Sequence, residues 1–163
     1  MLQRMSRRLW PTLIALLAAV SLLAASNPAR AAGADAASVT GVVDRLLDAW
    51  NKRDAASFSA LFSEDGDFIE TRGGRIHGRS NIQAAVAKLF KQAKAENHAA
   101  RGQTDVKMVK PDVALILARL SITSGKSAPG GALATAVLVS AGGKWRISAL
   151  EVATGVPAAS GKR

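Results

Sequence analysis

The chain has 163 residues, of which 48% are hydrophobic and 21% are charged, and its formal net charge is +10. This length suits a single domain with one hydrophobic core, and the positive charge favours solubility and acidic partners without requiring nucleic acid. There is no cysteine and no tyrosine, which excludes disulfides, thiol catalysis, cysteine metal ligands and a phenolic oxyanion donor.

The first 31 residues have the layout of a secretory signal peptide. Arg4, Arg7 and Arg8 precede an apolar run over residues 9–25, and small residues follow, so that cleavage is expected after Ala31. The alternative is a membrane anchor, for which this proline-containing run stands at the lower length limit. We expect an exported protein, periplasmic or secreted, that touches the membrane only through the signal before cleavage.

Two helices are predicted after a flexible leader over residues 32–37. The first is indicated by an apolar stripe at helical spacing, made of Val39, Val42, Val43, Leu46, Leu47 and Trp50. Asp54 is predicted to cap a short second helix that turns Phe58, Leu61 and Phe62 inward.

A short β-hairpin is predicted next. The segment SEDGD is typical of a turn, and residues 67–71 then alternate as a strand that carries Phe68 and Glu70 on one face. Gly73 and Gly74 supply the reversal for a returning strand, RIHG.

A third helix follows the hairpin. Ser80 and Gln83 form a capping-box pattern at its start, and its apolar stripe repeats that of the first helix: Ile82, Ala85, Val86, Leu89, Phe90 and Ala93. Its lysine face carries no interleaved aromatic residues, which is typical of a solvated surface and argues against nucleic-acid binding.

The remainder is predicted to be strands, over residues 105–110, 113–123, 132–140 and 144–154, with 155–163 as a disordered tail. Turns such as Pro111–Asp112 connect them into a meander from about His98 onward. Three amphipathic helices before antiparallel strands predict an α+β domain over residues 38–154, in which helices and a strongly curved sheet enclose a cavity.

This order of elements resembles the nuclear-transport-factor-2-like (NTF2-like) superfamily, especially its small bacterial SnoaL-like and SgcJ/EcaC-type (DUF4440-like) members. The matching segments are LLDAWNKRDAASFSALFSEDGDFI, GGRIHGRSNI, VKPDVALILARLSIT and GGKWRISALE. The resemblance implies a cone-shaped fold and a homodimer formed through the sheet. It implies no single activity, because the same cone hosts isomerases, dehydratases, cyclases and proteins without chemistry.

Glu70 is the first candidate catalytic residue. Its position is similar to that of the catalytic aspartate in steroid isomerases of this superfamily, where a carboxylate base faces an apolar cavity. Burial there would disfavour the charged form and make a carboxylate a better base near neutral pH. The alternative is a solvated glutamate at a strand end, or one paired with Arg72, Arg75 or Arg79. The absence of tyrosine counts against isomerase activity.

Glu151 is the second catalytic candidate. It lies six residues after Trp145, which places both on one face of a regular strand. Related SnoaL-like chains often carry a polar pocket residue near this point. If Glu151 is buried it needs a partner, and Arg119, isolated inside an apolar strand, is a candidate for pairing across neighbouring strands and for ligand binding. The alternative is two unrelated edge positions.

The two histidines are weaker candidates. His77 could serve as an acid or base beside Glu70, and His98 could contact a ligand, whereas both could equally be partly exposed residues at turns and strand ends. No HxH or HExxH spacing is present, so we expect no metal site.

Trp50, Phe68 and Phe90 are the predicted aromatic lining of the cavity, with plain core packing as the alternative. The leading hypothesis is an exported domain that binds a small, largely apolar molecule, with cofactor-independent proton transfer by Glu70 as an added possibility. The competing hypothesis is a non-catalytic, dimeric ligand-binding or interaction module. SgcJ/EcaC-type relatives are called oxidoreductases, but no glycine fingerprint for a nicotinamide or flavin is present, and we expect no cofactor.

Overall fold

The computed structural model describes residues 28–92, 97–124 and 130–156. Most of the predicted signal peptide, the centre of the loop before residue 130 and most of the predicted tail lie outside these residues. The chain divides into residues 1–34 and residues 35–163, and the second unit carries the fold and the site. No helix in the described part of the chain is long and apolar enough to cross a membrane.

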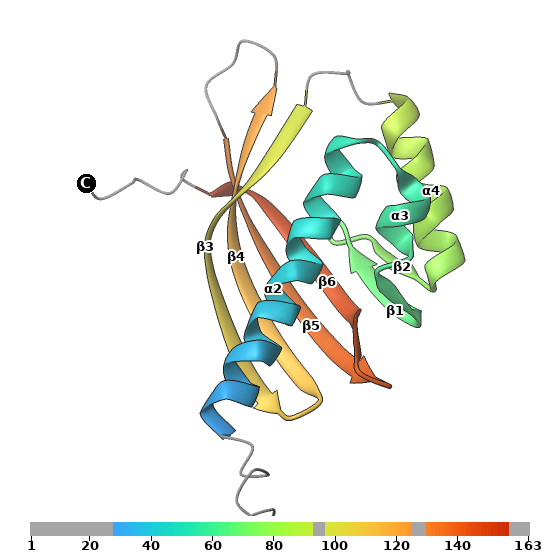
Figure 1. The fold of residues 1–163 in the computed structure, drawn as a ribbon. Coiled ribbons are helices and arrows are strands. Elements are labelled where there is room, and N and C mark those ends of the chain that lie inside the picture. The colour runs from blue at the N-terminus through green and yellow to red at the C-terminus, as the bar shows by residue number, and fades with distance from the viewer. Residues whose placement is uncertain (1–27, 93–96, 125–129, 157–163) are drawn as a thin grey trace, which may run out of the picture. The chain divides into compact units, whose positions relative to one another are not determined.

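The helices are α2 (Pro28–Asn51), α3 (Ala55–Ser59) and α4 (Arg79–Gln92) (Figure 1). Helix α2 begins earlier than predicted, so the expected flexible leader at 32–37 is helical, and the expected cleavage point lies inside the helix. Asp54 caps α3 as predicted, because its carboxylate accepts a hydrogen bond of 2.9 Å from the Ser57 backbone N–H.

The capping box predicted for α4 does not form. The helix begins at Arg79, so Ser80 lies inside its first turn, where it cannot act as the cap. The side chain of Gln83 instead accepts a hydrogen bond from the hydroxyl of Ser59 on α3 (3.5 Å). The same hydroxyl lies nearer to the Ala56 carbonyl oxygen (3.1 Å), so its contact with Gln83 is the weaker of the two.

The strands form one six-stranded sheet in the order β2-β1-β6-β5-β4-β3. Their bounds are β1 (Phe62–Ile69), β2 (Arg75–His77), β3 (Asn97–Lys110), β4 (Val113–Ser124), β5 (Gly130–Ala141) and β6 (Lys144–Val156). Strands β3 to β6 form the predicted antiparallel meander, whereas β1 pairs with β6 in parallel. From residue 35 onward α2 runs across one face of the meander, and the hairpin β1–β2 continues the sheet beside α3 and α4 (Figure 1).

The prediction of a turn at SEDGD is wrong, because these residues belong to β1. The strand bulges there, since Phe62 pairs with Ile147 and Asp67 pairs with Ala149. A β-carbon at Gly66 would lie 3.0 Å from the Ile147 carbonyl oxygen and 3.2 Å from the Phe62 β-carbon. A larger residue would therefore crowd the backbone where the bulge brings the two strands together, and glycine avoids this.

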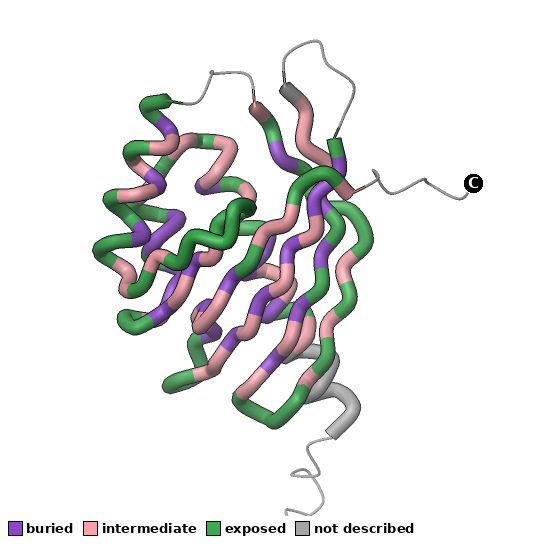
Figure 2. The backbone as a smooth tube through the Cα atoms, turned by 180° about the vertical axis from the view of Figure 1, so that it is seen from behind, coloured by how far each residue is buried: buried purple, intermediate pink, exposed green. Residues whose placement is uncertain are grey.

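Burial alternates along the strands (Figure 2), which separates an inner face that packs against α2 from an outer face. The inner face of β5 carries Ala132, Ala134, Ala136 and Leu138, all buried. On the outer face Leu117 remains 41% exposed. Small residues thus occupy much of the inner face of a central strand.

Strand β6 contains an extra residue at Ser148. Leu138 of β5 stands opposite Ile147, while its neighbour Val137 stands opposite Ala149, so one step along β5 corresponds to two along β6. A bulge of one residue exchanges the two faces of a strand for every position beyond it. The inward residue after the bulge is therefore Leu150, which is buried.

Candidate functional site

A cavity of about 570 Å³ lies between α2 and the inner face of the sheet. Its walls come from every layer of the unit, and most of the lining side chains are apolar: Val43, Leu46, Leu47, Trp50, Phe58, Phe68, Leu89, Ala99, Leu120, Ile122, Ala134, Leu150 and Val152. The predicted hollow between helices and sheet is thus present.

The alanines of β5 explain why this space is not filled. The side chain of Ala134 on β5 is too short to reach α2, and the cavity lies beside it. Further along, Leu138 of β5 stands opposite Ile147 of β6, and only a void of about 20 Å³ remains beside them. The cavity therefore ends where the inward side chains of β5 change from alanine to leucine.

One end of the cavity is an aromatic wall. The four phenylalanines of the chain and Trp50 form a single cluster, in which the Phe58 ring lies 5.6–6.0 Å from the rings of Trp50, Phe62 and Phe68. Trp50, Phe58 and Phe68 face the cavity. Phe90 does not line it but packs edge-on behind Trp50, with ring centroids 5.2 Å apart. Such pairs hold the wall in one arrangement.

Backbone hydrogen bonds hold the C-terminal end of α2 in place, and with it Trp50. The Asp54 N–H donates to the Ala49 carbonyl and the Arg53 N–H to the Trp50 carbonyl, while Arg53 adopts a φ of 56°. This is a Schellman motif with arginine in the left-handed position that glycine usually fills. The Arg53 guanidinium also donates to the carbonyl of Phe90 (2.8 Å), which ties α2 to α4.

Within the described part of the chain, the polar residues that line the cavity lie at one exposed rim: Glu70, Thr71, Arg72, Gln92 and Thr154. They come from the β1–β2 loop, the last residue of α4 and the end of β6. The loop is closed by two backbone hydrogen bonds, from Gly73 N–H to the Glu70 carbonyl (2.7 Å) and from Glu70 N–H to the Gly74 carbonyl (2.8 Å). The interior is therefore apolar, and the mouth is polar.

Glu70 reaches the cavity, on the same side as Phe68, but it is exposed at the rim. The structure therefore agrees with the alternative of a solvated glutamate at a strand end, and not with a carboxylate buried in an apolar environment. No ion pair joins it to Arg72, Arg75 or Arg79 within the described residues. Its position suits contact with the polar end of a ligand better than proton abstraction inside the cavity.

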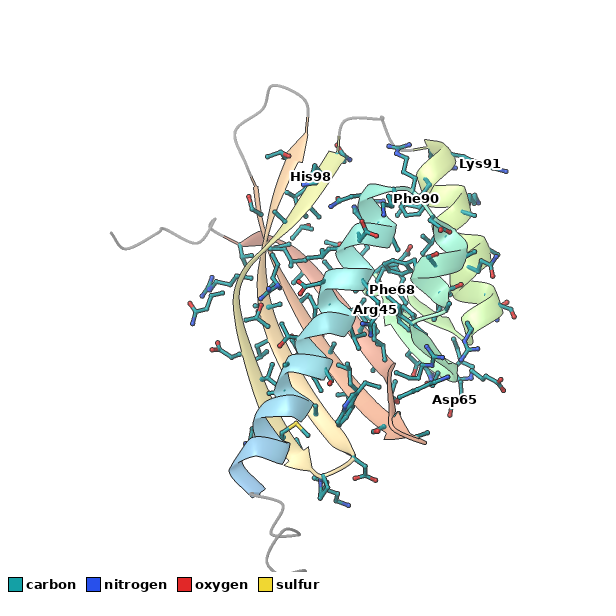
Figure 3. All side chains as sticks on the ribbon, viewed as in Figure 1. Arg45, Asp65, Phe68, Phe90, Lys91 and His98 are labelled. Carbon is teal, nitrogen blue, oxygen red and sulfur yellow. The ribbon has the colours of Figure 1, made fainter. Side chains whose placement is uncertain are left out.

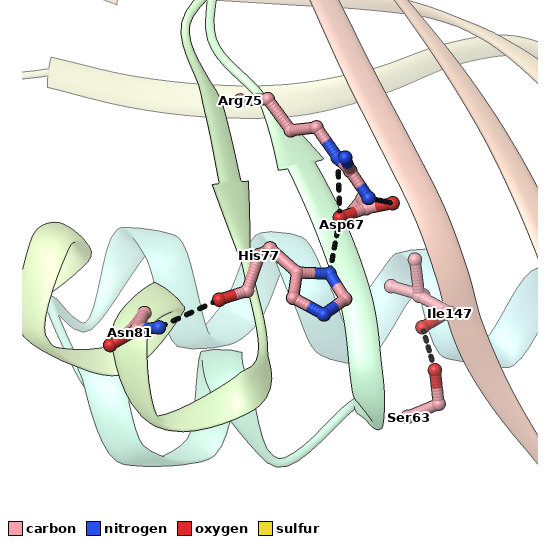
Figure 4. A network of polar contacts seen from close by, with 6 residues as sticks. All are labelled: Ser63, Asp67, Arg75, His77, Asn81 and Ile147. Carbon is pink, nitrogen blue, oxygen red and sulfur yellow. Dashed lines mark hydrogen bonds and ion pairs between the residues drawn. The ribbon is translucent and has the colours of Figure 1, made fainter.

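His77 lies away from the cavity and belongs to a separate network (Figure 4). Asp67 on β1 accepts two hydrogen bonds of 2.9 Å from Arg75 and a contact of 2.9 Å from the His77 Nδ1. The hydrogen bonds from Arg75, and then the contact with His77, lower the pKa of the Asp67 carboxyl below its ordinary value of 3.8. This network joins the two strands of the hairpin, so a catalytic role for His77 beside Glu70 has no support in the structure.

Glu151 does not share a face with Trp145, because the bulge at Ser148 reverses the alternation between them. Glu151 is exposed on the outer face, opposite Thr135 of β5. Arg119 is exposed on β4, and β5 lies between β4 and β6. The predicted pair across neighbouring strands is therefore wrong, and neither residue lines the cavity.

His98 also lies outside the cavity. Its neighbour Ala99 lines the cavity, so strand alternation places His98 on the exposed side of β3. Figure 3 shows His98 on β3 and Lys91 pointing away from α4, whereas Phe68 and Phe90 lie toward α2. No cluster of three or more histidine or carboxylate side chains suited to a metal occurs in residues 28–92, 97–124 and 130–156.

Two groups of cavity residues were not predicted from the sequence. The rim residues Thr71, Arg72, Gln92 and Thr154 carry no sequence signal, because the cavity mouth forms from segments distant in the chain. The inward alanines of β5 do carry one: every second residue from Ala132 to Ala136 is alanine, in phase with Leu138. Such a row on a central strand indicates a space that small side chains leave open.

The chain matches a known family model along most of its length. A family model described as a SnoaL-like domain matches residues 39–152. No match is found among curated proteins.

Several solved structures share the fold. A protein of unknown function from Nostoc punctiforme with a cystatin-like fold is 25% identical, with a TM-score of 0.69 over 76% of this chain and 78% of that chain. An NTF2-like protein of unknown function from Pseudomonas putida is 18% identical (TM-score 0.69; 80% and 93% covered). The hexachlorocyclohexane dehydrochlorinase LinA-type3 from Novosphingobium barchaimii is 14% identical (TM-score 0.70; 80% and 94% covered). These likenesses concern the fold, because one fold hosts many activities.

Proposed function

The chain belongs to the SnoaL-like domain family of the NTF2-like superfamily, and we propose that it binds a small, largely apolar molecule in the cavity beneath α2. The observation that carries the proposal is a cavity of about 570 Å³ with apolar interior walls and with its polar residues at one exposed rim. Small-molecule pockets measure roughly 300–1,000 Å³, and they combine an apolar lining with a few polar groups that orient the ligand.

The apolar walls supply enough energy for useful affinity. A ligand of two aromatic rings and the wall around it together remove about 600 Å² of apolar surface from water, worth roughly 15 kcal/mol. Association costs about half of this or more in lost freedom of motion. We therefore expect dissociation constants near the micromolar range for apolar molecules of this size.

A binding role accounts for the site better than proton transfer does. The titratable side chains that line the cavity are Glu70 and Arg72, and both are exposed. No described carboxylate or imidazole lies inside the cavity to act on the buried part of a ligand. General acid–base catalysis requires the catalytic group within hydrogen-bond reach of the proton it moves, so we place chemistry by Glu70 second.

The cavity can be tested with N-phenyl-1-naphthylamine, an uncharged dye that fluoresces in apolar surroundings. Val152 lines the cavity, and the next residue, Ala153, lies on the other face of β6. Val152→Phe should narrow the cavity and weaken dye binding at least about tenfold, because the added ring occupies part of the space that the dye needs. Ala153→Phe is the matched control and should bind as the natural protein does.

Both variants must first show cooperative thermal unfolding, so that loss of binding is not loss of fold. The proposal fails if the natural protein neither binds the dye nor is stabilised by it. It also fails if Val152→Phe and Ala153→Phe bind the dye equally, since the dye would then occupy another surface.

We also propose a homodimer formed through the outer face of the sheet. Leu117 is 41% exposed there, and its apolar neighbours on that face include Leu115 and Val137. Burying such a face against a second copy removes apolar surface from water. Sedimentation should give twice the chain mass, whereas a monomer at all concentrations would exclude the dimer.

Export is proposed on the pattern of residues 1–31 alone. The predicted product after cleavage would be found in the periplasm or medium of a bacterial host. Fractionation of expressing cells, followed by N-terminal sequencing, checks both the location and the cleavage point after Ala31. Full-length chain in the membrane fraction would favour the anchor instead.

A further inference from the structure

The exposed rim indicates which end of a ligand stays outside the cavity. We propose that the ligand carries an anionic group, a carboxylate or sulfonate, on the side of its apolar body that faces the rim, and that Arg72 binds this group. The inference deepens the proposed function and rests on it. It concerns the specificity of the same cavity.

Arg72 is held at the cavity mouth by the geometry of the β1–β2 loop. Glu70 and Gly73 close a β-turn through their 2.7 Å backbone bond, and Arg72 occupies the position before Gly73 in that turn. Gly73 has a φ of 80°, which glycine adopts without strain. The loop therefore fixes the backbone of Arg72 beside the opening, and the long side chain can turn toward a ligand.

Arg72 differs from its neighbouring arginines because no described residue pairs with it. Arg75 binds Asp67 through two hydrogen bonds, and Arg79 donates to the carbonyl of Phe62 (2.9 Å). Arg72 makes no hydrogen bond or ion pair with any residue in the described part of the chain, yet it lines the cavity. A guanidinium offers a planar fork of N–H donors that matches a carboxylate or sulfonate in two parallel hydrogen bonds.

The other rim groups are compatible with an anion. Thr71, Gln92 and Thr154 are neutral and can each donate a hydrogen bond. Lys91 precedes the rim residue Gln92 but does not line the cavity, so it contributes positive charge only from a distance. Glu70 is the opposing charge, but its Oε2 lies only 3.2 Å from where a β-carbon on Gly74 would stand, so it rests against its own loop.

The expected effect is moderate because the rim is exposed. An ion pair that is fully exposed to water contributes little to the binding free energy. A bidentate pair that the bound ligand partly shields from water contributes more. We therefore expect Arg72 to favour an anionic ligand over its neutral analogue by roughly three- to tenfold.

The test compares two dyes with the same ring system. 1-Anilinonaphthalene-8-sulfonate carries a sulfonate, and N-phenyl-1-naphthylamine does not. Their affinities are measured for the natural protein and for Arg72→Gln, Glu70→Gln and Arg119→Gln. Arg119→Gln is the matched control, because it removes the same charge from an exposed site outside the cavity.

Arg72→Gln should weaken binding of the sulfonate dye three- to tenfold and leave the neutral dye within twofold. Arg119→Gln should change neither dye by more than about 1.5-fold. Glu70→Gln should strengthen binding of the sulfonate dye, since it removes a like charge from the rim.

The inference is overturned if Arg72→Gln binds the neutral dye as before and keeps the full preference for the sulfonate. It is also overturned if Arg72→Gln weakens both dyes equally, which would mean that Arg72 only supports the loop. Failure of the natural protein to bind the neutral dye would instead overturn the proposed function, so the two failures are distinguishable.

Discussion

At the scale of single residues, Asn51 is the side chain that joins α2 to the edge of the sheet. Its amide donates to the Ala99 carbonyl and accepts from the Ala99 N–H, both at 2.8 Å. Strand β3 is the last in the sheet, so Asn51 occupies the place of a further strand at this point. Ala99 lines the cavity, and Asn51 therefore sets the position of its wall.

We predict that Asn51→Ala lowers the free energy of unfolding by about 1–3 kcal/mol, because it leaves a buried donor and acceptor without partners. Asn81→Ala is the control, since Asn81 makes one exposed bond to the His77 carbonyl that water can replace. Chemical denaturation measures both. A loss for Asn51→Ala no larger than for Asn81→Ala would contradict this account of the wall.

At the scale of elements, the hairpin β1–β2 depends on the charge of Asp67. Its side chain is 23% exposed and is shared by Arg75 and His77 of the other strand. The hydrogen bonds from Arg75 are the main cause of its lowered pKa. A carboxyl whose pKa is lower in the folded than in the unfolded protein stabilises the fold above its ordinary value of 3.8, and this stabilisation is lost as pH falls through the folded pKa.

We predict that Asp67→Asn makes thermal stability fall less between pH 5 and pH 2 than in the natural protein. Arg75→Gln should act in the same direction, because it removes the main cause of the shift. Some acid sensitivity should remain in both, since hydrogen bonds from Ser57 also lower the pKa of Asp54. Melting curves across this range check the prediction, and an unchanged pH dependence in Asp67→Asn would contradict it.

At the scale of the whole molecule, the cavity is a space between α2 and the sheet that side chains do not fill. Ala134 faces the cavity of about 570 Å³, whereas Ala136, two residues along the same face, borders only the void of about 20 Å³. Added methyl groups gain burial where there is space and cause strain where there is none. Substitutions at Ala134 and Ala136 therefore compare an unfilled space with a tightly packed site on the same strand.

We predict that Ala134→Val raises the free energy of unfolding by up to about 1 kcal/mol and weakens binding of the neutral dye. Ala136→Val should instead destabilise the protein by about 1–3 kcal/mol through overpacking. Denaturant unfolding with and without dye measures both effects. If Ala134→Val destabilises as much as Ala136→Val, the space beneath α2 is not available to a ligand.

The sequence by itself determined that three helices precede four long antiparallel strands, and which residues of α2 and α4 face the core. The stripe from Val39 to Trp50 and the cap at Asp54 are local patterns, since each depends on residues a few positions apart. The order of elements, with the segments quoted above, resembles the NTF2-like superfamily, and the match to the SnoaL-like domain model confirms it.

Only the tertiary structure decided the site. The extra residue at Ser148 turned Glu151 outward, the place of β5 between β4 and β6 separated Arg119 from Glu151, and the loop closure left Glu70 exposed. The first two of these results depend on which strands pair, and in what register. Local periodicity specifies a face only while the strand stays regular, because one unpaired residue reverses every position after it.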